Sequence, residues 1–305
     1  MTQDIIKKDN PNLDLIKKLV TNGLESKYSK LMYDKAVSDF LTWRQAQGDP
    51  AFTPALVEAY KHHLITDTSY APSTINQKLS AIRRLAKVAE DNNLMDPQVA
   101  EKVRQVSNVK RSGLRQGTWL SKEQAQDLIL TPDTSTLKGL RDRAILAVLV
   151  GAGLRRSELS ALTFSHIQQI KGRWALVDIL GKRNKVRTVP IPAWVKQAID
   201  EWATSANLSE GRVFRSITKG DVLSKSMSDQ AVADVVKTYA KARGFGIAPH
   251  DLRRTFAQLS HEAGGNLRQL QLALGHDSID TTNKYLGGDL DYGHAVCDLI
   301  GLHLE

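Results

Sequence analysis

Hydrophobic residues recur every three or four positions through most of the first hundred residues, which is the period of an amphipathic helix. The pattern predicts helices over residues 26–43, 53–65 and 96–106, and a longer helix within SYAPSTINQKLSAIRRLAKVAEDNNL. The longer helix has one apolar stripe, formed by Ile75, Leu79, Ile82, Leu85 and Val88. We therefore expect residues 1–106 to form an all-helical N-terminal domain.

The hydrophobic period is lost in the segment SNVKRSGLRQG, residues 107–117. This segment is polar, basic and contains glycine, which is typical of a linker between domains. Lys110, Arg111 and Arg115 would let the linker follow a polyanion. A solvated basic loop explains the same composition equally well.

The remaining residues, 118–305, combine helical periods with one β-type stretch. RWALVDIL (173–180) and VRTVPIP (186–192) flank the basic sequence GKRNK and predict a hairpin. Apolar periods predict helices within 140–163 and over 192–206, 227–244, 249–264, 267–275 and 280–286. The expected fold class is mainly α, with a small antiparallel β-sheet in the second part.

The net charge of +9 adds a candidate partner to this picture. Residues up to 116 carry 18 Lys and Arg against 13 Asp and Glu, and the later residues carry 24 against 20. Because both parts are basic, nucleic acid is a candidate partner. Charge alone is equally compatible with a soluble basic protein that binds no nucleic acid. The long helix offers four DNA-binding candidates, for which a solvated helix face is the alternative: Lys78, Arg83, Arg84 and Lys87.

Several other classes of protein find no support in the sequence. A single cysteine, Cys297, excludes an internal disulfide and a zinc site built from several cysteines. No apolar run approaches the ~20 residues that span a bilayer, and no secretion signal is visible, so we expect no membrane contact and a cytoplasmic location. We find no paired-carboxylate metal site, phosphate-binding loop or dinucleotide fingerprint, and therefore expect no metal and no cofactor.

Three basic clusters in the second part carry candidate chemistry. Arg155 begins a helix, and Glu158 lies one turn on, where it can hold the guanidinium; a surface ion pair is the alternative. Lys182 lies in the hairpin, where an ordinary charged turn is the alternative. His250 and Arg253 share a helix face and suit an oxyanion or phosphate, although a solvated pair is the commoner arrangement.

Arginine, lysine, His-x-x-Arg, histidine and tyrosine follow one another in flanking sequences that resemble tyrosine recombinases of the phage-integrase type. GLRRSEL resembles the family's first arginine box, GKRNKVRTVPIP its lysine hairpin and PHDLRRTFA its His-x-x-Arg box. LGHDSIDTTNKYL resembles the closing box that contains the nucleophile. The motifs cover nearly all of residues 118–290, and the simple two-domain members, such as Xer and integron-type recombinases, are the most similar.

The resemblance assigns roles to these residues. It implies that Arg155 and Arg253 grip the non-bridging oxygens of the scissile phosphate, with Glu158 as the partner of Arg155. His250 would assist proton movement, and His276 would position the phosphate. These four groups would stabilise the charge that grows on the phosphate oxygens during attack.

The nucleophile and the general acid complete the implied site. Tyr285 would attack phosphorus, and Lys182 would protonate the leaving 5′ oxygen. The resemblance thus implies a metal-independent, tyrosine-type site-specific recombinase that forms a covalent 3′-phosphotyrosine. A type IB topoisomerase-like enzyme and a catalytically inactive DNA-binding protein are the alternatives.

The implied architecture is the DNA breaking-rejoining enzyme fold. A SAM-like core-binding domain would occupy residues 1–106, followed by the linker 107–117 and the catalytic domain 118–305. The implied working unit is a homotetramer on two sites in double-stranded DNA, with a monomer or dimer on a single site. A tail helix over 295–302 would dock into a neighbouring protomer, or else pack on its own domain.

Overall fold

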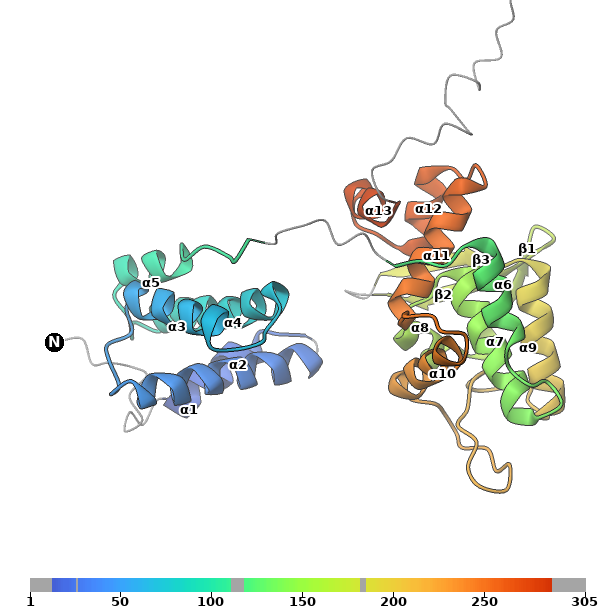
Figure 1. Ribbon diagram of the computed structural model, residues 1–305, viewed down its shortest axis with the longest axis horizontal. Helices are drawn as coiled ribbons and strands as arrows, with labels where there is room; N and C mark the ends of the chain where they lie inside the picture. Colours follow the sequence, from blue (N-terminus) through green and yellow to red (C-terminus); the bar gives the residue numbers. More distant parts are fainter. Residues whose placement is uncertain (1–12, 26, 111–117, 182–184, 287–305) are drawn as a thin grey trace, which may run out of the picture. The chain divides into compact units, whose positions relative to one another are not determined.

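The structure is a computed structural model that describes residues 13–25, 27–110, 118–181 and 185–286. The chain divides into two compact units, Met1–Leu114 and Arg115–Glu305 (Figure 1). Each unit has a hydrophobic core of its own: Phe40 is fully buried in the first, and Trp202 in the second. Separate cores of this kind are what independently packed bodies of this size form.

The described part of the first unit is all helical, as predicted. Its helices are α1 (Leu13–Asn22), α2 (Lys27–Ala46), α3 (Pro54–Thr66), α4 (Pro72–Asp91) and α5 (Pro97–Arg104). The apolar stripe of α4 lies at the centre, where Leu79, Ile82 and Leu85 have no exposed surface. Phe40 of α2 and Tyr60 of α3 meet edge to face with ring centroids 5.0 Å apart. Burial of these amphipathic faces holds the helices together.

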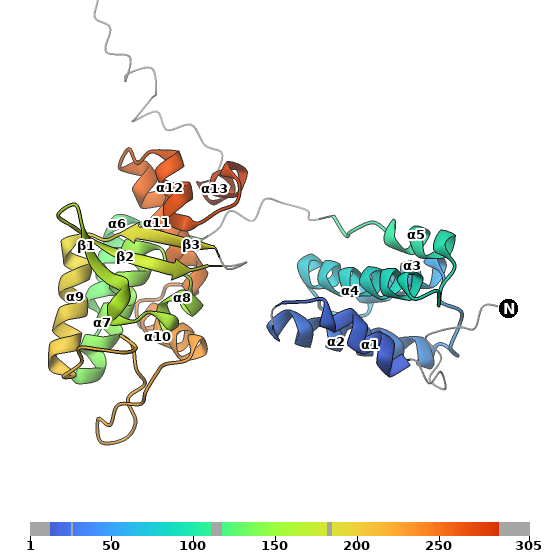
Figure 2. The same ribbon diagram turned by 180° about the vertical axis from the view of Figure 1, so that it is seen from behind.

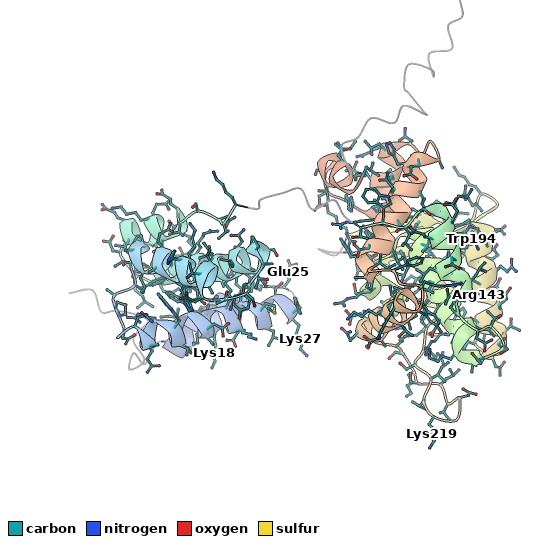
Figure 3. All side chains as sticks on the ribbon, in the orientation of Figure 1. Lys18, Glu25, Lys27, Arg143, Trp194 and Lys219 are labelled. Atoms are coloured by element: carbon teal, nitrogen blue, oxygen red, sulfur yellow. The ribbon has the colours of Figure 1, made fainter. Side chains whose placement is uncertain are left out.

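The second unit is mostly helical with one small sheet, as predicted. Its helices are α6 (Lys122–Leu130), α7 (Leu137–Ala152), α8 (Arg156–Ala161), α9 (Ala193–Ser205), α10 (Asp229–Ala242), α11 (Pro249–Glu262), α12 (Leu267–Leu274) and α13 (Ile279–Leu286), with a 3₁₀ turn over Phe164–His166. The connection between α9 and α10 projects from the body of the unit and carries Lys219 near its tip (Figure 3).

The sheet contains three antiparallel strands in the order β1 (Ile167–Ile170), β2 (Arg173–Leu180) and β3 (Val186–Pro190). Figure 2 shows the three strands side by side on one side of the helical body. The predicted hairpin corresponds to β2 and β3, and β1 is additional. It escaped prediction because most of its residues are exposed, so it lacks the alternation that marks a half-buried strand.

Helix α7 runs through the core of the second unit, packed against α6, α9 and α11. Its residues from Ala144 to Val150 are all buried. A helix that is apolar all round needs neighbours on every side, and the surrounding helices supply them. Among the described residues, no helix is both long and apolar enough to cross a membrane.

Candidate active site

The corner between α7 and α8 presents Arg155. Gly153 ends α7 in the left-handed region with φ 59°, and a Cβ added there would lie 2.4 Å from the Phe256 ring. The positive φ and the close approach together favour glycine at this position. The chain then buries Leu154 and begins α8 with Arg155 as the N-cap, its side chain only partly exposed.

The carboxylate of Glu158 holds two arginines. It accepts hydrogen bonds from the backbone N–H of Arg155 at 2.8 Å and from Arg155 Nη1 at 2.7 Å. Arg187 on β3 donates to it from Nη1 at 2.9 Å and from Nη2 at 2.8 Å. Burial alone would raise the pKa of Glu158, but hydrogen bonds and charge from Arg187, followed by Arg155, lower it to about 2. Glu158 therefore carries its negative charge throughout the physiological range.

Arg253 contacts the same corner between α7 and α8 from the inside of the unit. Its side chain comes from α11 and is almost fully buried. Nη1 donates to the carbonyl oxygen of Gly153 at 2.6 Å, and Nη2 donates to the carbonyl oxygen of Leu274 at the end of α12. A buried guanidinium is costly unless its donors are satisfied, and these carbonyls satisfy two of them. The contacts hold a permanent cation between α7, α11 and α12.

A cleft of about 330 Å³ opens beside these arginines. It is lined by Leu154, Arg155, Arg156, Ser157, Ala248, Pro249, His250 and Arg253. His250 lies in the first turn of α11, and the pKa of its imidazole is lowered by burial and then by Arg254 and Arg253. The structure thus brings three of the predicted site residues, Arg155, His250 and Arg253, to one cleft.

His276 follows the C-terminus of α12. Gly275 ends that helix with φ 64°, and the His276 backbone N–H then donates to the carbonyl oxygen of Gln271. The ring Nδ1 lies 2.9 Å from the hydroxyl of the buried Thr282. Burial, followed by the charges of Arg253, Arg155, Arg187 and His250, lowers the pKa of His276 to about 4. His276 is therefore a neutral imidazole at neutral pH, within the field of the arginine cluster.

Tyr285 lies in the last turn of α13, and its side chain is outside the described part of the structure. The helix itself packs on α11 and α12. Thr282 is fully buried, and Leu286 packs on a small cluster that includes Leu270 and Phe256. The backbone that carries Tyr285 is therefore docked on its own unit, close in sequence to His276.

Lys182 lies outside the described residues, but Gly181 and Lys185, which flank its turn, are described. The Gly181 N–H donates to the carbonyl oxygen of Lys185 at 2.7 Å, which closes the mouth of the hairpin. The ammonium of Lys185 pairs with Asp277, the residue after His276. This ion pair links the turn end of the lysine hairpin to the segment that leads into α13.

Arg187 is a site residue that the sequence analysis missed. Besides its two bonds to Glu158, it donates from Nε to the carbonyl oxygen of Ala273 on α12 at 2.8 Å. The sequence did contain a signal for it. Side chains alternate along a strand, and Arg187 lies two positions before the buried Val189, so both lie on the same face of β3. An arginine on the inner face of a strand requires a partner, but the partner is visible only in the fold.

Two of the basic residues of α4, Lys78 and Arg84, have partners inside the helical unit. Lys78 is 8% exposed, pairs with Asp39 and lies 5.0 Å from the centroid of the Tyr70 ring. Arg84 donates from Nε to the carbonyl oxygen of Val20 at 2.7 Å, which ties α4 to α1. Both charges are thus engaged inside the helical unit, and DNA binding by Lys78 and Arg84 stays a prediction.

Arg83 and Lys87 have partners within the first unit as well. Arg83 donates from Nη2 to the carbonyl oxygen of Val106 and to the side chain of Asn108, both at 2.8 Å. These bonds fasten the segment after α5 to α4. Lys87 is exposed and pairs with Asp91 at 2.7 Å on the same helix. An exposed pair of this kind is weak, so Lys87 stays available to an external anion.

The linker candidates lie at the limit of the described chain. Lys110 is exposed. It follows Val109, whose backbone N–H and carbonyl both bond to the side chain of Asn76 at 2.8 and 3.0 Å. Arg111 and Arg115 lie outside the described residues. The start of the linker is thus anchored to α4, with Lys110 directed away from the core.

The cleft in the second unit suits a singly or doubly charged oxyanion. Two guanidiniums and two imidazoles come together, and Glu158 pairs directly with one of them, Arg155. Arginine forks match phosphate oxygens, and a neutral imidazole has one N–H that can donate to the same oxygens. A cationic cleft of this kind, in a mostly helical unit with a small sheet, defines a candidate phosphodiester-binding site.

The chain belongs to the phage integrase family, whose sequence pattern matches residues 118–289. It is 35% identical over 182 residues to tyrosine recombinase XerC of Xylella fastidiosa strain 9a5c, covering 59% of each chain. It is 28% identical over 280 residues to tyrosine recombinase XerD of Lacticaseibacillus casei, covering 87% of this chain and 89% of that protein. The match thus spans about three fifths of the XerC relative and most of the XerD relative.

Solved structures show the same fold at low sequence identity. The Tn1549 transposon integrase in complex with circular intermediate DNA has a TM-score of 0.68 at 15% identity, covering 94% of this chain and 98% of that one. A lambda integrase dimer bound to a core site also gives 0.68 at 15% identity, covering 91% and 77%. XerH bound to its difH substrate gives 0.67 at 20% identity, covering 90% and 80%. These likenesses confirm the predicted fold class.

Proposed function

We propose that this protein is a site-specific DNA recombinase that cuts and rejoins DNA through a covalent 3′-phosphotyrosine intermediate. One observation carries the proposal: Arg155, His250 and Arg253 line one cleft, and His276 lies within the field of both arginines. Membership of the phage integrase family and similarity to proteins named tyrosine recombinase support it. No metal or cofactor enters the proposed reaction.

The proposed mechanism begins with the scissile phosphate in the cationic cleft. Attack on phosphorus adds negative charge to the non-bridging oxygens, and Arg155 and Arg253 stabilise that charge because they are already in place. Glu158 keeps Arg155 oriented. Thr282 holds the ring of His276, so that a neutral imidazole contacts the phosphate without adding another charge to the cluster.

Tyr285 is the proposed nucleophile. A tyrosine phenol in water has a pKa of ~10, and a cationic pocket favours the phenolate that attacks phosphorus. The new bond joins the tyrosine oxygen to phosphorus as the bond from phosphorus to the 5′ oxygen breaks. Lys182 gives the leaving oxygen its proton, and His250 assists proton movement. Because the phosphotyrosine conserves a phosphodiester, a 5′ hydroxyl from another strand can reverse the step without ATP.

Exchange between two sites requires four cleavage events, so we propose a homotetramer on two sites in double-stranded DNA, with a monomer or dimer on one site. Solved relatives named as DNA complexes, XerH with difH and a lambda integrase dimer with its core site, support DNA as the partner. The tail helix predicted over 295–302 lies outside the described residues. Its docking into a neighbouring protomer belongs to the proposal.

A covalent-capture experiment tests the function. Duplexes selected from a random pool by binding to Tyr285→Phe supply a site, and a nick near the scissile position makes it a suicide substrate. The wild-type chain should form a protein–DNA adduct that survives denaturation, and Tyr285→Phe should form none. Binding without an adduct would identify a DNA-binding protein and contradict the proposed chemistry.

A second experiment separates recombination from relaxation. A supercoiled plasmid with two selected sites should yield products in which the flanking segments are exchanged. Relaxation of a supercoiled plasmid without exchange would instead identify a type IB topoisomerase-like enzyme. A plasmid with one scrambled site is the control and should give no exchange product.

A further inference from the structure

Arg187 joins three segments of the candidate site through one side chain. It lies on β3, the second strand of the lysine hairpin, and its side chain is 9% exposed. Nη1 and Nη2 bind the two oxygens of Glu158, and Nε binds the carbonyl oxygen of Ala273. Each of its three nitrogens therefore donates to an acceptor inside the protein.

Glu158 connects Arg187 to Arg155, the arginine proposed to contact the phosphate. Glu158 Oε1 accepts from both Arg187 Nη1 and Arg155 Nη1, at 2.9 and 2.7 Å. If Arg187 were removed, the buried carboxylate would keep Arg155 as its remaining guanidinium partner among the described residues, and it would draw that side chain inward. The guanidinium of Arg187 makes two bonds to the carboxylate and that of Arg155 makes one, so the Arg155 side chain stays partly exposed towards the cleft.

The other side of Arg187 shapes the turn that presents His276. Ala273 is one residue before the end of α12, and a Cβ added at Gly275 would lie 2.9 Å from Arg187 Cδ. Glycine is thus required at 275 by the close approach of Arg187 as well as by its positive φ. The charge of Arg187 also contributes to the lowered pKa of His276. Arg187 thus holds the backbone three residues before this imidazole, through the carbonyl oxygen of Ala273.

We infer that Arg187 is a positioning residue for the cleavage step. This inference rests on the proposed function. Arg187 fixes the position of Arg155 through Glu158 and the position of His276 through the C-terminal end of α12. Both side chains can then contact the same phosphate. The Arg187 side chain is 9% exposed and each of its three nitrogens donates within the protein, so we assign it to holding these partners rather than to gripping the phosphate. Lysine cannot replace it, because an ammonium lacks the planar fork that binds both carboxylate oxygens.

Two substitutions and a matched control test the inference. Arg187→Lys and Arg187→Ala remove the fork, and Arg143→Lys removes the fork of another arginine that pairs with a glutamate, Glu201, in the same unit. Arg143 lies on α7 (Figure 3) and lines a different pocket from the cleft of Arg155, together with Trp194 and Glu201. The measurements are the single-turnover rate of adduct formation at saturating DNA, the Kd for the same DNA and the Tm.

Both Arg187 variants should form the adduct about 100-fold more slowly than wild type, because misplacement by about 1 Å of groups that hold the reacting centre has a cost of this size. Their Kd should stay near the wild-type value, and Arg143→Lys should keep the wild-type rate. An unchanged rate in Arg187→Lys would overturn the inference. Loss of folding in both Arg187 variants would also overturn it, since Arg187 would then be a stability residue.

A double-mutant cycle tests whether Arg187 acts through Glu158. Glu158→Gln, Arg187→Lys and the double variant are compared in the same rate assay. If the two residues act as a unit, the double variant should be no slower than the slower single variant. Losses that multiply would contradict the proposed route. Absence of any adduct with the wild-type chain would reject the proposed function itself, whereas a wild-type adduct with full Arg187→Lys activity rejects this inference alone.

Discussion

Arg253 Nη1 donates a hydrogen bond to the carbonyl oxygen of Gly153, 2.6 Å away and 100 positions earlier in the chain. Gly153 is the residue that ends α7 before Arg155 begins α8. The buried guanidinium of Arg253 thus supports the backbone that presents Arg155. The two arginines of the cleft are parts of one structural unit, and a change at the corner between them should affect both.

Gly153→Ala should destabilise the second unit. The positive φ costs about 1–2 kcal/mol for a residue with a Cβ, and the overlap with the Phe256 ring adds about 1–3 kcal/mol. The control is Gly172→Ala, which has φ 77° and nothing within 4 Å of the added Cβ. Urea unfolding should show the larger loss for Gly153→Ala, and equal losses would contradict the role given to the Phe256 contact.

Glu158→Gln should lower the free energy of unfolding by about 3–5 kcal/mol, because it removes the charge that compensates a largely buried arginine pair. Glu201→Gln removes the partner of Arg143 at a more exposed site, with an expected loss of about 1 kcal/mol or less. Thermal and urea unfolding of the two variants provide the comparison. Similar losses would show that the Glu158 cluster is not specially stabilising.

The acid dependence of stability should change when Glu158 is replaced. Its pKa falls from 4.5 to about 2 on folding, so its contribution is complete above pH 4.5 and is lost as the pH falls towards 2. Glu158→Gln should therefore show a shallower loss of stability in this window than wild type. Unfolding followed from pH 5 to pH 2 measures the difference, and identical slopes would rule out the lowered pKa.

His276 should contribute a pH dependence at a higher range. Its pKa falls from 6.5 to about 4 on folding, so the unfolded chain takes up the proton first as the pH decreases. Wild-type stability should consequently decrease between pH 6.5 and pH 4, and His276→Gln should flatten that decrease. His250, whose pKa is also lowered, acts in the same direction, so a residual slope is expected in the variant. An unaltered slope would show that His276 is not held neutral.

The basic residues of the first unit should separate into structural and DNA-contacting groups. Arg84→Ala should reduce the stability of the helical unit by about 1–3 kcal/mol, because it leaves the buried carbonyl of Val20 without its donor. Lys110→Ala should leave stability unchanged and reduce the slope of log K against log salt by about 0.9, as expected for one lost phosphate contact. DNA binding titrated over a range of salt concentrations, with unfolding as a second measurement, checks both; an unchanged slope in Lys110→Ala would exclude the contact.

The sequence by itself determined most of the helices, the hairpin and the family, although α1 was not among the predicted helices. Apolar periods are local, and burial of one face is enough to select a helix such as α4 or the strands β2 and β3. The same information placed Arg155 and Glu158 one turn apart. It did not reveal β1, because an exposed strand has no alternation to detect.

Only the tertiary structure decided which charges are free and which are paired. Lys78 and Arg84 look like an open basic face in the sequence, yet the fold turns them onto Asp39 and the carbonyl of Val20. Arg187 looks like an ordinary strand residue, yet it meets a carboxylate 29 positions earlier and a carbonyl 86 positions later. Pattern in a sequence reports the neighbours along a helix or strand, whereas the energy of a buried charge depends on partners that folding brings from distant segments.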